Sequence, residues 1–385
     1  MKKICLITTT RADFGIIKNL IHKLKENKKF KIKIIAGGSH FLKSFGKTIS
    51  EIKKERIKID HSIKLKAFKD DAKTIAKAFA ETTYSTCLIL KKISPDILIV
   101  VGDRYEILAS VVAANFLRIP IAHLYGGEIT EGSMDDSFRH SITKLSHVHF
   151  VANKVYRQRL IQLGESSKNI HVVGGLAADN ISCLNFLSKK DLEKKLKLKF
   201  KKNNYVVNFH PETSKKNSTR VQIDTILKAL QNFKNSNFIF TSPGFDLENN
   251  IISKRIKKLT REKKNIFFFK SLGQLKYFSL LKYSTGMIGN SSSGILEMPY
   301  FKKPSINLGT RQKGRLKSKS IINCSIEIGS IRKALTKLEN KKNLKKINYS
   351  LPYGRSGAIK KIIKILENIK LNNLFIKKFQ DKKLI

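Results

Sequence analysis

Short apolar runs alternate with longer amphipathic stretches along most of this chain. In the first half, residues 4–7, 31–36 and 97–101 have the pattern of buried parallel strands. Each is followed by a polar loop and then by apolar residues at helical spacing, which is the βα unit of a doubly wound fold. The alternation restarts after Lys202, with further apolar runs at 205–209, 238–240, 266–268, 286–288 and 304–308. We therefore predict an α/β fold with two doubly wound Rossmann-like domains.

Two such halves imply a cleft between their sheets, an arrangement found in glycosyltransferases of the GT-B type. We place the first domain at residues 1–185 and the second at 186–355, followed by a C-terminal helix and tail at 356–385. The lysine-rich segment 189–202 is interpreted as the linker between the domains, and 304–308 as the strand that completes the core of the second domain. The first strand-to-helix turn lacks the G-x-G-x-x-G pattern, so no dinucleotide site is predicted there.

Acidic residues are scarce in this chain, yet several gather where predicted strands end. Asp103 follows an apolar strand, and Glu128 follows a second, shorter one. Asp135 and Asp136 open a helix, where acids also serve as ordinary N-terminal capping groups. Because open α/β sheets bind ligands at the carboxyl ends of their strands, we expect a site there. Basic and imidazole side chains accompany these acids: Arg104, Arg139, His123 and His140.

The second half holds a loop suited to an anion. The sequence GNSSSGILE at 289–297 brings small residues to the start of a helix, where backbone amides and the helix dipole favour a diphosphate. A serine N-cap is the alternative interpretation of this loop. His210 ends a predicted strand and could bind a phosphate or a sugar, or could instead fill the core. Arg11, at the first strand-to-helix turn, and Arg311, in the segment GTRQKG, could bind an anion, with ordinary surface arginine as the alternative.

The composition is strongly basic but otherwise globular. The chain has 77 Lys and Arg against 29 Asp and Glu, a formal net charge of +48, which could indicate nucleic-acid binding. The excess is mostly lysine spread along amphipathic helices, with no tight basic block and no zinc-finger, RRM or helix-turn-helix signature. Solvated helix faces are therefore the favoured interpretation, and no specific nucleic acid is predicted. The surplus could still attract an anionic substrate.

We predict a cytoplasmic protein without a metal or another cofactor. The four cysteines are far apart in sequence, which fits a reducing compartment. His147 and His149 share one face of a predicted strand and could form a metal pair. Structural histidines are favoured because no cysteine or carboxylate lies nearby at ligand spacing. No signal peptide is predicted, and no apolar stretch is long enough to span a membrane.

Several motifs occur in a fixed order: GDRYE, HLYGGE, DDSFRHSITKLSH, NFHPET, GNSSSG and NLGTRQKGR. Through them the chain resembles the hydrolysing UDP-N-acetylglucosamine 2-epimerases, which start bacterial sialic-acid and related nonulosonic-acid synthesis. The resemblance extends from TTTRADFG to PYGRSG. It implies a GT-B architecture whose closing helix crosses back to the first domain. It also implies conversion of UDP-N-acetylglucosamine and water to N-acetylmannosamine and UDP, by loss of UDP and the C2 proton followed by addition of water.

The resemblance also assigns roles to residues. Asp103 and Asp135 match the family's acid–base residues, and we nominate Glu128 as a further acid because many relatives carry Glu where this chain has Tyr125. The serines and the glutamate of 289–297 would contact the UDP phosphates and the ribose. The positions expected to bind substrate are Arg11, Arg104, Asp136, Arg139, His210, Ser291, Ser292, Glu297 and Arg311.

Two other functions remain open at this point. The same reaction could act on a UDP- or GDP-linked 2,4-diacetamido-2,4,6-trideoxyglucose of the legionaminic acid pathway, since the motif that begins ITEG occurs in both branches of the family. A GT-B glycosyltransferase would share the fold but would give no reason for the acids at Asp103, Glu128 and Asp135. A homo-oligomer, either a dimer or a tetramer, is expected.

Overall fold

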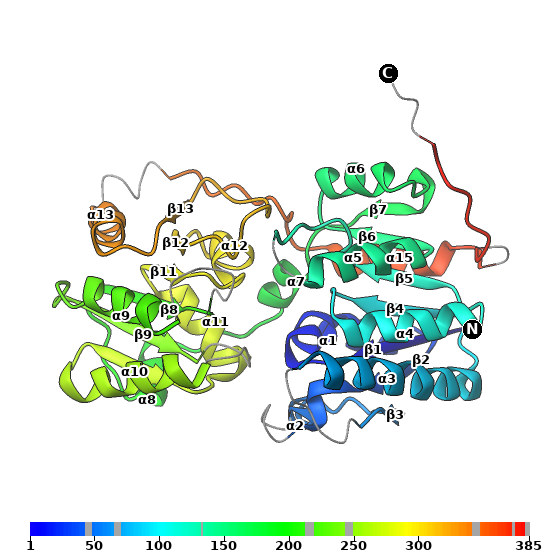
Figure 1. Ribbon diagram of the computed structural model, residues 1–385, viewed down its shortest axis with the longest axis horizontal. Coiled ribbons are helices and arrows are strands. Elements are labelled where there is room, and N and C mark those ends of the chain that lie inside the picture. Colours follow the sequence, from blue (N-terminus) through cyan, green and yellow to red (C-terminus); the bar gives the residue numbers. More distant parts are fainter. Residues whose placement is uncertain are drawn as a thin grey trace. The chain divides into compact units, whose positions relative to one another are not determined.

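The computed structural model describes residues 1–42, 48–64, 71–131, 134–211, 219–242, 249–340, 347–371 and 374–381. The chain forms two compact units (Figure 1). Unit 1 comprises Met1–Ile129, Ser133–Ser182 and Tyr353–Ile385, and unit 2 comprises Thr130–Gly132 and Cys183–Pro352.

In the described part of unit 1, seven parallel strands form a sheet in the order β3-β2-β1-β4-β5-β6-β7. The chain order reverses between β1 and β4, which is the topological switch point where such sheets bind ligands. The central strand β4 has the sequence ILIVV and is buried along its whole length, as a strand covered on both faces must be. The strands are β1 (Lys2–Thr8), β2 (Phe30–Ala36), β3 (His61–Ser62), β4 (Ile97–Val101), β5 (Ile121–Leu124), β6 (Val148–Val151) and β7 (Ile170–Val172).

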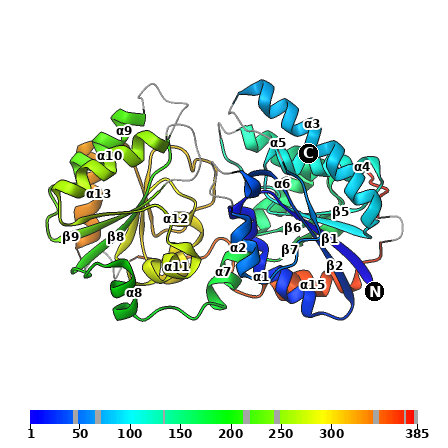
Figure 2. The ribbon, with the colours of Figure 1, turned by 90° about the horizontal axis from the view of Figure 1, so that it is seen from below.

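Helices cover both faces of this sheet (Figure 2). On one face, α3, α4 and α5 pack on alternate strand residues such as Ile7 and Val100. On the other face, α1 and α15 pack on Leu6 and Ile99. The helices and 3-10 turns of unit 1 are α1 (Arg11–Glu26), η1 (Gly38–Phe41), α2 (Ile49–Lys54), α3 (Ala72–Ile93), α4 (Tyr105–Phe116), α5 (Met134–Leu145), α6 (Lys154–Gln162), η3 (Ser167–Asn169), α7 (Leu176–Ser182) and α15 (Ala358–Asn368).

The last helix, α15, is part of unit 1 although it follows unit 2 in the sequence. Its apolar face, which includes Ile359 and Ile362, is buried in the same core as α1. The carboxylate of Asp179 accepts the backbone N–H groups of Gly357 and Ala358 at 2.9 and 3.0 Å, and so satisfies two free amides at the helix start. The end of α7 and the start of α15 are therefore fixed to each other.

In the described part of unit 2, six parallel strands follow the order β10-β9-β8-β11-β12-β13, which repeats the order of the first six strands of unit 1. The switch point lies between β8 and β11. The segment 304–308 contains β12, the last strand that the sequence pattern predicted, and β13 pairs with β12 beyond it as one further strand. This edge strand is only partly buried, so its apolar signal is weak. The strands are β8 (Asn203–Asn208), β9 (Ser236–Thr241), β10 (Ile266–Phe269), β11 (Gly286–Gly289), β12 (Ser305–Leu308) and β13 (Ile321–Cys324).

The lysine-rich segment 189–202, which was predicted to be a linker, instead contains helix α8 (Lys189–Leu196). Ser188 caps this helix by accepting the backbone N–H of Asp191 at 3.1 Å. Leu192 and Leu196 are buried, and their spacing of four places both on one helix face. The lysines occupy the solvent side, so composition alone suggested a linker. The division between the units instead falls after Ser182.

Unit 2 also has helices on both faces of its sheet (Figure 2). One face carries α9, α10 and α13 over a core that includes Phe238 and Phe240, and the other carries α8, α11 and α12. The two Rossmann-like sheets confirm the predicted α/β fold class. None of the described helices is long and apolar enough to cross a membrane. The remaining elements are α9 (Thr219–Leu230), α10 (Asn249–Glu262), α11 (Gly273–Tyr283), α12 (Ser293–Leu296), η4 (Met298–Phe301) and α13 (Ile328–Glu339).

Candidate active site

Arg139, in α5, joins the acidic residues that the sequence placed at strand ends. Its guanidinium donates to the carboxylate of Asp103, to Asp136 Oδ1 at 2.8 Å and to the backbone carbonyl of Glu128 at 3.0 Å. The Arg139 side chain is only 2% exposed, whereas Asp103 and Asp136 are 26% and 24% exposed. The structure therefore brings together the ends of β4 and β5 and the first turns of α5, with two carboxylates that a ligand can reach.

Asp135 lies near this cluster and has an altered acidity. Burial, together with the negative charge of Asp103, raises the pKa of Asp135 to about 6, although the charges of Arg104 and Arg139 act in the opposite direction. Arg104 is itself held by Glu106, with its Nε and Nη2 at 3.1 and 3.2 Å from the carboxylate oxygens. A carboxyl group whose pKa lies near neutrality can both accept and release a proton, as an acid–base catalyst must.

We expect the substitution Asp103→Asn to lower the pKa of Asp135 from about 6 toward its ordinary value of 3.8. The substitution removes a negative charge that disfavours ionisation and leaves the nearby arginines charged. A ¹³C NMR titration of the Asp135 carboxyl measures this change. The control is Asp96→Asn, since Asp96 precedes β4 at its opposite end. An Asp135 pKa that is the same in both variants would show that burial alone sets it.

The loop after β5 contains Glu128 and two residues with left-handed backbone. Tyr125 has φ 69° and Gly127 has φ 81°. The Tyr125 hydroxyl accepts the backbone N–H of Leu176 at 2.7 Å, so this side chain satisfies the first amide of α7. A Cβ atom on Gly127 would lie 2.7 Å from a methyl group of Leu160, so only glycine fits there. Glu128 follows directly and is 4% exposed.

Arg11 occupies a different environment at the first turn of α1. It is exposed, and its Nη1 lies 4.0 Å from Glu51 Oε1. Sequence reasoning missed Asp13 in the same turn, which forms a capping box with Thr10. Burial raises the pKa of Asp13, and the charge of Arg104 opposes that rise. The Thr-x-x-Asp spacing at 10–13 was the available signal.

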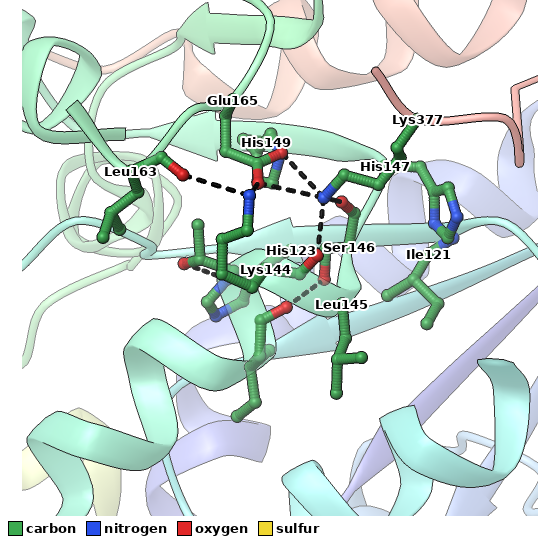
Figure 3. A network of polar contacts seen from close by, with 12 residues as sticks. Ile121, His123, Lys144, Leu145, Ser146, His147, His149, Leu163, Glu165 and Lys377 are labelled. Carbon is green, nitrogen blue, oxygen red and sulfur yellow. Dashed lines mark hydrogen bonds and ion pairs between the residues drawn. The ribbon is translucent and has the colours of Figure 1, made fainter. Parts of the chain in front are cut away.

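A buried ionic network holds the other end of α5 (Figure 3). Glu165 accepts from His149 Nε2 at 3.0 Å and pairs with Lys144 and Lys377, each at 2.8 Å. Lys377 also donates to the carbonyls of Lys144 and Ser146, both at 2.6 Å, at the C-terminal end of the helix. Burial alone would raise the pKa of Glu165, but these hydrogen bonds lower it to about 2. The C-terminal tail thus fixes the end of the helix that carries the acids.

The two histidines of this region have separate structural contacts. The His147 ring accepts the backbone N–H of Ile121 at 3.2 Å and stacks on Phe375 with ring centroids 4.8 Å apart. His149 bonds to Glu165, a carboxylate that lies 16 residues away in sequence, so local spacing could not reveal it. Among the described residues, no group of three or more His, Cys, Asp or Glu side chains could hold a metal ion.

In unit 2, Asn290 connects the predicted anion ligands at the switch point. Its side chain accepts the backbone N–H of His210 at 2.7 Å and donates to the His210 carbonyl at 2.9 Å. Its own carbonyl accepts from Arg311 Nη1 at 3.1 Å and from Gln312 Nε2 at 2.9 Å. His210 and Arg311 are thereby brought beside the loop that contains Ser291. The sequence analysis missed this role of Asn290 because its partners lie 80 residues before it and 21 and 22 residues after it.

The loop that contains Ser291 and Ser292 leads into a single helical turn. Because α12 has only four residues, its dipole is weaker than the sequence analysis assumed, and the loop amides are the more important donors. Ser291 is buried and its Oγ accepts the backbone N–H of Ser293 at 3.3 Å. Burial raises the pKa of Glu297. Within the described residues its Oε2 is buried without a hydrogen-bond partner, which suits a carboxylate that accepts from a ligand hydroxyl.

The chain is similar to known proteins over most of its length. A family model described as UDP-N-acetylglucosamine 2-epimerase matches residues 22–367. The chain is 41% identical to the GDP/UDP-N,N'-diacetylbacillosamine 2-epimerase (hydrolyzing) of Campylobacter jejuni, over 99% of each protein. It is 34% identical to polysialic acid biosynthesis protein P7 of Escherichia coli, over 99% of this chain and 98% of that protein.

A solved structure shares the whole fold. It is the crystal structure of UDP-GlcNAc 2-epimerase from Neisseria meningitidis bound to UDP-GlcNAc, which superposes with a TM-score of 0.80 at 19% identity. The match covers 95% of this chain and 99% of that one. It supports the GT-B type of fold that the sequence predicted.

Proposed function

Because this chain belongs to the UDP-N-acetylglucosamine 2-epimerase family, we propose that it is a hydrolysing nucleotide-sugar 2-epimerase acting through the acids around Arg139. The observation that carries this proposal is the pair Asp103 and Asp135, whose mutual charge helps raise the pKa of Asp135 to about 6. A base must remove the proton at C2 in this reaction, and a carboxyl group whose pKa lies near neutrality suits that step.

The chemistry defines what the acids must do. The nucleoside diphosphate leaves C1 with the electrons of the C1–O bond, and a base removes the C2 proton as C1 becomes electron-poor. The product of this step is a glycal with a C1–C2 double bond. Water then adds to C1 and a proton adds to the opposite face of C2, which gives the free 2-epimer. Two proton-transfer groups on opposite sides of the sugar are therefore required.

We assign the removal of the C2 proton to Asp135. The second group is Asp103 or Glu128, because Arg139 gathers the carboxylate of one and the backbone of the other. Arg139 also fixes Asp136, which can accept a sugar hydroxyl. Loss of a general acid or base of this kind typically lowers turnover by roughly 10²–10⁴-fold.

Unit 2 supplies groups for the nucleotide. The loop amides with Ser291 and Ser292 would bind the diphosphate, and the buried Oε2 of Glu297 would accept a ribose hydroxyl. Asn290 places His210 and Arg311 beside this loop. There they would bind the phosphates of the departing nucleoside diphosphate through polar and charged contacts. No metal or other cofactor is part of the proposal.

For the sugar, we propose N,N'-diacetylbacillosamine, that is 2,4-diacetamido-2,4,6-trideoxyglucose, linked to UDP or GDP. Support comes from the 41% identity over 99% of both chains with the Campylobacter enzyme named for that substrate. The sequence alone had favoured UDP-N-acetylglucosamine, which remains the second candidate because the family model carries its name. A glycosyltransferase is not favoured, since the family model and the Campylobacter relative are both named as 2-epimerases.

Turnover in deuterium oxide tests the proposal. The protein is incubated separately with UDP-N-acetylglucosamine and with the UDP and GDP forms of N,N'-diacetylbacillosamine, and the products are followed by NMR. We expect free 2,4-diacetamido-2,4,6-trideoxymannose with deuterium at C2 and an equal amount of released nucleoside diphosphate. If UDP-N-acetylglucosamine is the one substrate of the three that is turned over, the proposed sugar is wrong but the proposed reaction stands. A gluco product that keeps its C2 hydrogen would contradict the reaction.

A further inference from the structure

His123 is a fully buried histidine at the meeting point of the segments that carry the acids. It lies in β5, between β4 and β6, with no exposed surface. Its Nε2 is 2.9 Å from the backbone carbonyl of Gly102, the residue before Asp103. Its Nδ1 is 3.2 Å from the hydroxyl of Thr143, in α5. One imidazole ring therefore bridges the turn after β4 and the helix that begins near Asp135.

The partners determine which nitrogen of His123 carries the proton. A carbonyl can only accept, so Nε2 must bear the hydrogen that is donated to Gly102. The ring is neutral because burial lowers the pKa of His123 to about 3. Nδ1 then has a lone pair and accepts the hydroxyl hydrogen of Thr143. In the other tautomer, the lone pair of Nε2 would face the carbonyl oxygen of Gly102, and neither atom could donate a hydrogen.

The His123 bridge runs parallel to the ion pair between Arg139 and Asp103. Arg139 and Thr143 are four residues apart in α5, so they lie on the same helix face, one turn apart. The two contacts therefore hold α5 against the turn that contains Asp103 at two successive levels. The level formed by Thr143 is wholly buried, because Thr143 and His123 are both 0% exposed.

The third acidic segment packs on the same bridge. A Cβ atom on Gly126 would lie 3.0 Å from the Thr143 hydroxyl and 3.1 Å from His123 Nδ1. The backbone that leads to Glu128 thus passes directly over the contact between the histidine and the threonine. Any shift in that contact is transmitted to the loop, since close-packed interiors leave no free space to absorb it.

We propose that His123 is a positioning residue which sets the relative placement of Asp103, Glu128 and Asp135 through its bridge between Gly102 and Thr143. It does not exchange protons with the substrate. It acts on the reaction only through the geometry of the three acids. The kinetic part of the test rests on the proposed function, whereas the spectroscopic part does not.

The substitution Thr143→Val removes the hydroxyl and keeps the shape of the side chain. We expect turnover to fall roughly 10- to 100-fold, as a displacement of about 1 Å at a catalytic group can cause, with little change in UDP affinity. Thr143→Ser keeps the hydroxyl and should recover most of the turnover. The matched control is Thr86→Val, which removes another buried hydroxyl of unit 1, at the contact between Thr86 and Ser110. Its turnover should stay near that of the wild type.

NMR provides readouts that do not need activity. The ¹⁵N spectrum of His123 should show a proton on Nε2 and none on Nδ1 from about pH 5 to pH 8. The carboxyl pKa of Asp135 should change more in Thr143→Val than in Thr86→Val. A proton on Nδ1, or equal turnover in the two valine variants, would overturn the proposal. If the wild type turns over no nucleotide sugar, the proposed function fails. The ¹⁵N spectrum of His123 and the carboxyl titration of Asp135 still decide the role of His123.

Discussion

Replacing Asp135 by Asn is expected to lower turnover roughly 10²–10⁴-fold and, at the same time, to make the folded protein more stable at pH 7. The folded-state pKa of Asp135 is about 6, against 3.8 ordinarily. A carboxyl group whose pKa is raised by folding stabilises the protein below about pH 3.8. The protein loses this contribution as the pH rises from about 3.8 to about 6, and the loss is complete above that range. Asn carries no charge to bury, so the free energy of unfolding should rise by roughly 1–3 kcal/mol.

Thermal unfolding at pH 4 and pH 7 checks the stability change, which should be present at pH 7 and nearly absent at pH 4. UDP binding, measured by calorimetry, should stay within a few fold of the wild type because the loop at Ser291 is untouched. The control is Asp191→Asn, since Asp191 is exposed and lies in the first turn of α8. An Asp135→Asn protein that is less stable at pH 7, or that keeps wild-type turnover, would contradict the assignment.

The substitution Gly289→Ala is expected to disrupt unit 2 and abolish tight UDP binding. Gly289 ends β11 with φ 139°, and a Cβ atom there would lie 1.9 Å from the Asn208 carbonyl oxygen of β8. That oxygen belongs to the backbone of a central strand and cannot move away cheaply. We expect a loss of roughly 3–5 kcal/mol in the free energy of unfolding. Asn290 follows Gly289 directly. In any variant protein that does fold, the contacts of Asn290 to His210 and Arg311 should therefore be displaced.

Thermal unfolding and UDP calorimetry measure both effects of Gly289→Ala. The matched control is Gly329→Ala in α13, where an added Cβ meets no atom within 4 Å. Alanine is the better helix former, so this variant should gain up to about 1 kcal/mol. Similar stability and UDP affinity in the two variants would show that the end of β11 tolerates a side chain and does not form the nucleotide loop.

The sequence predicted the features that depend on local pattern. The buried run before Asp103 predicted the strand, and the polar residues after it predicted a ligand site at the strand end. The reason is physical: parallel strands covered on both faces are continuously apolar, and their carboxyl ends face the same edge. The pair Asp135 and Asp136 at a helix start was identified in the same way. Arg139 was placed with them because it lies one turn further along that helix.

Features that depend on distant partners escaped the sequence analysis. Glu165 looks like an ordinary surface acid until His149 and Lys377 are found around it. Asn290 looks like one polar residue of a loop, yet it bonds to both sides of its switch point. The helix at Lys189–Leu196 was missed for a different reason, because its two buried leucines are outweighed by lysines in any compositional average.

The position of α15 has a consequence for the order in which the protein folds during synthesis. Unit 2 is contiguous from Cys183 to Pro352 apart from three residues, so all of it has been synthesised before α15 is made. Unit 1 lacks Ile359 and Ile362 from its core until then, and it lacks Lys377 beside Glu165 for longer still. The amino-terminal unit should therefore be the last to become stable, in contrast to the usual order in which N-terminal domains fold first. Nascent chains that end before Tyr353 should be the forms that chaperones and proteases recognise.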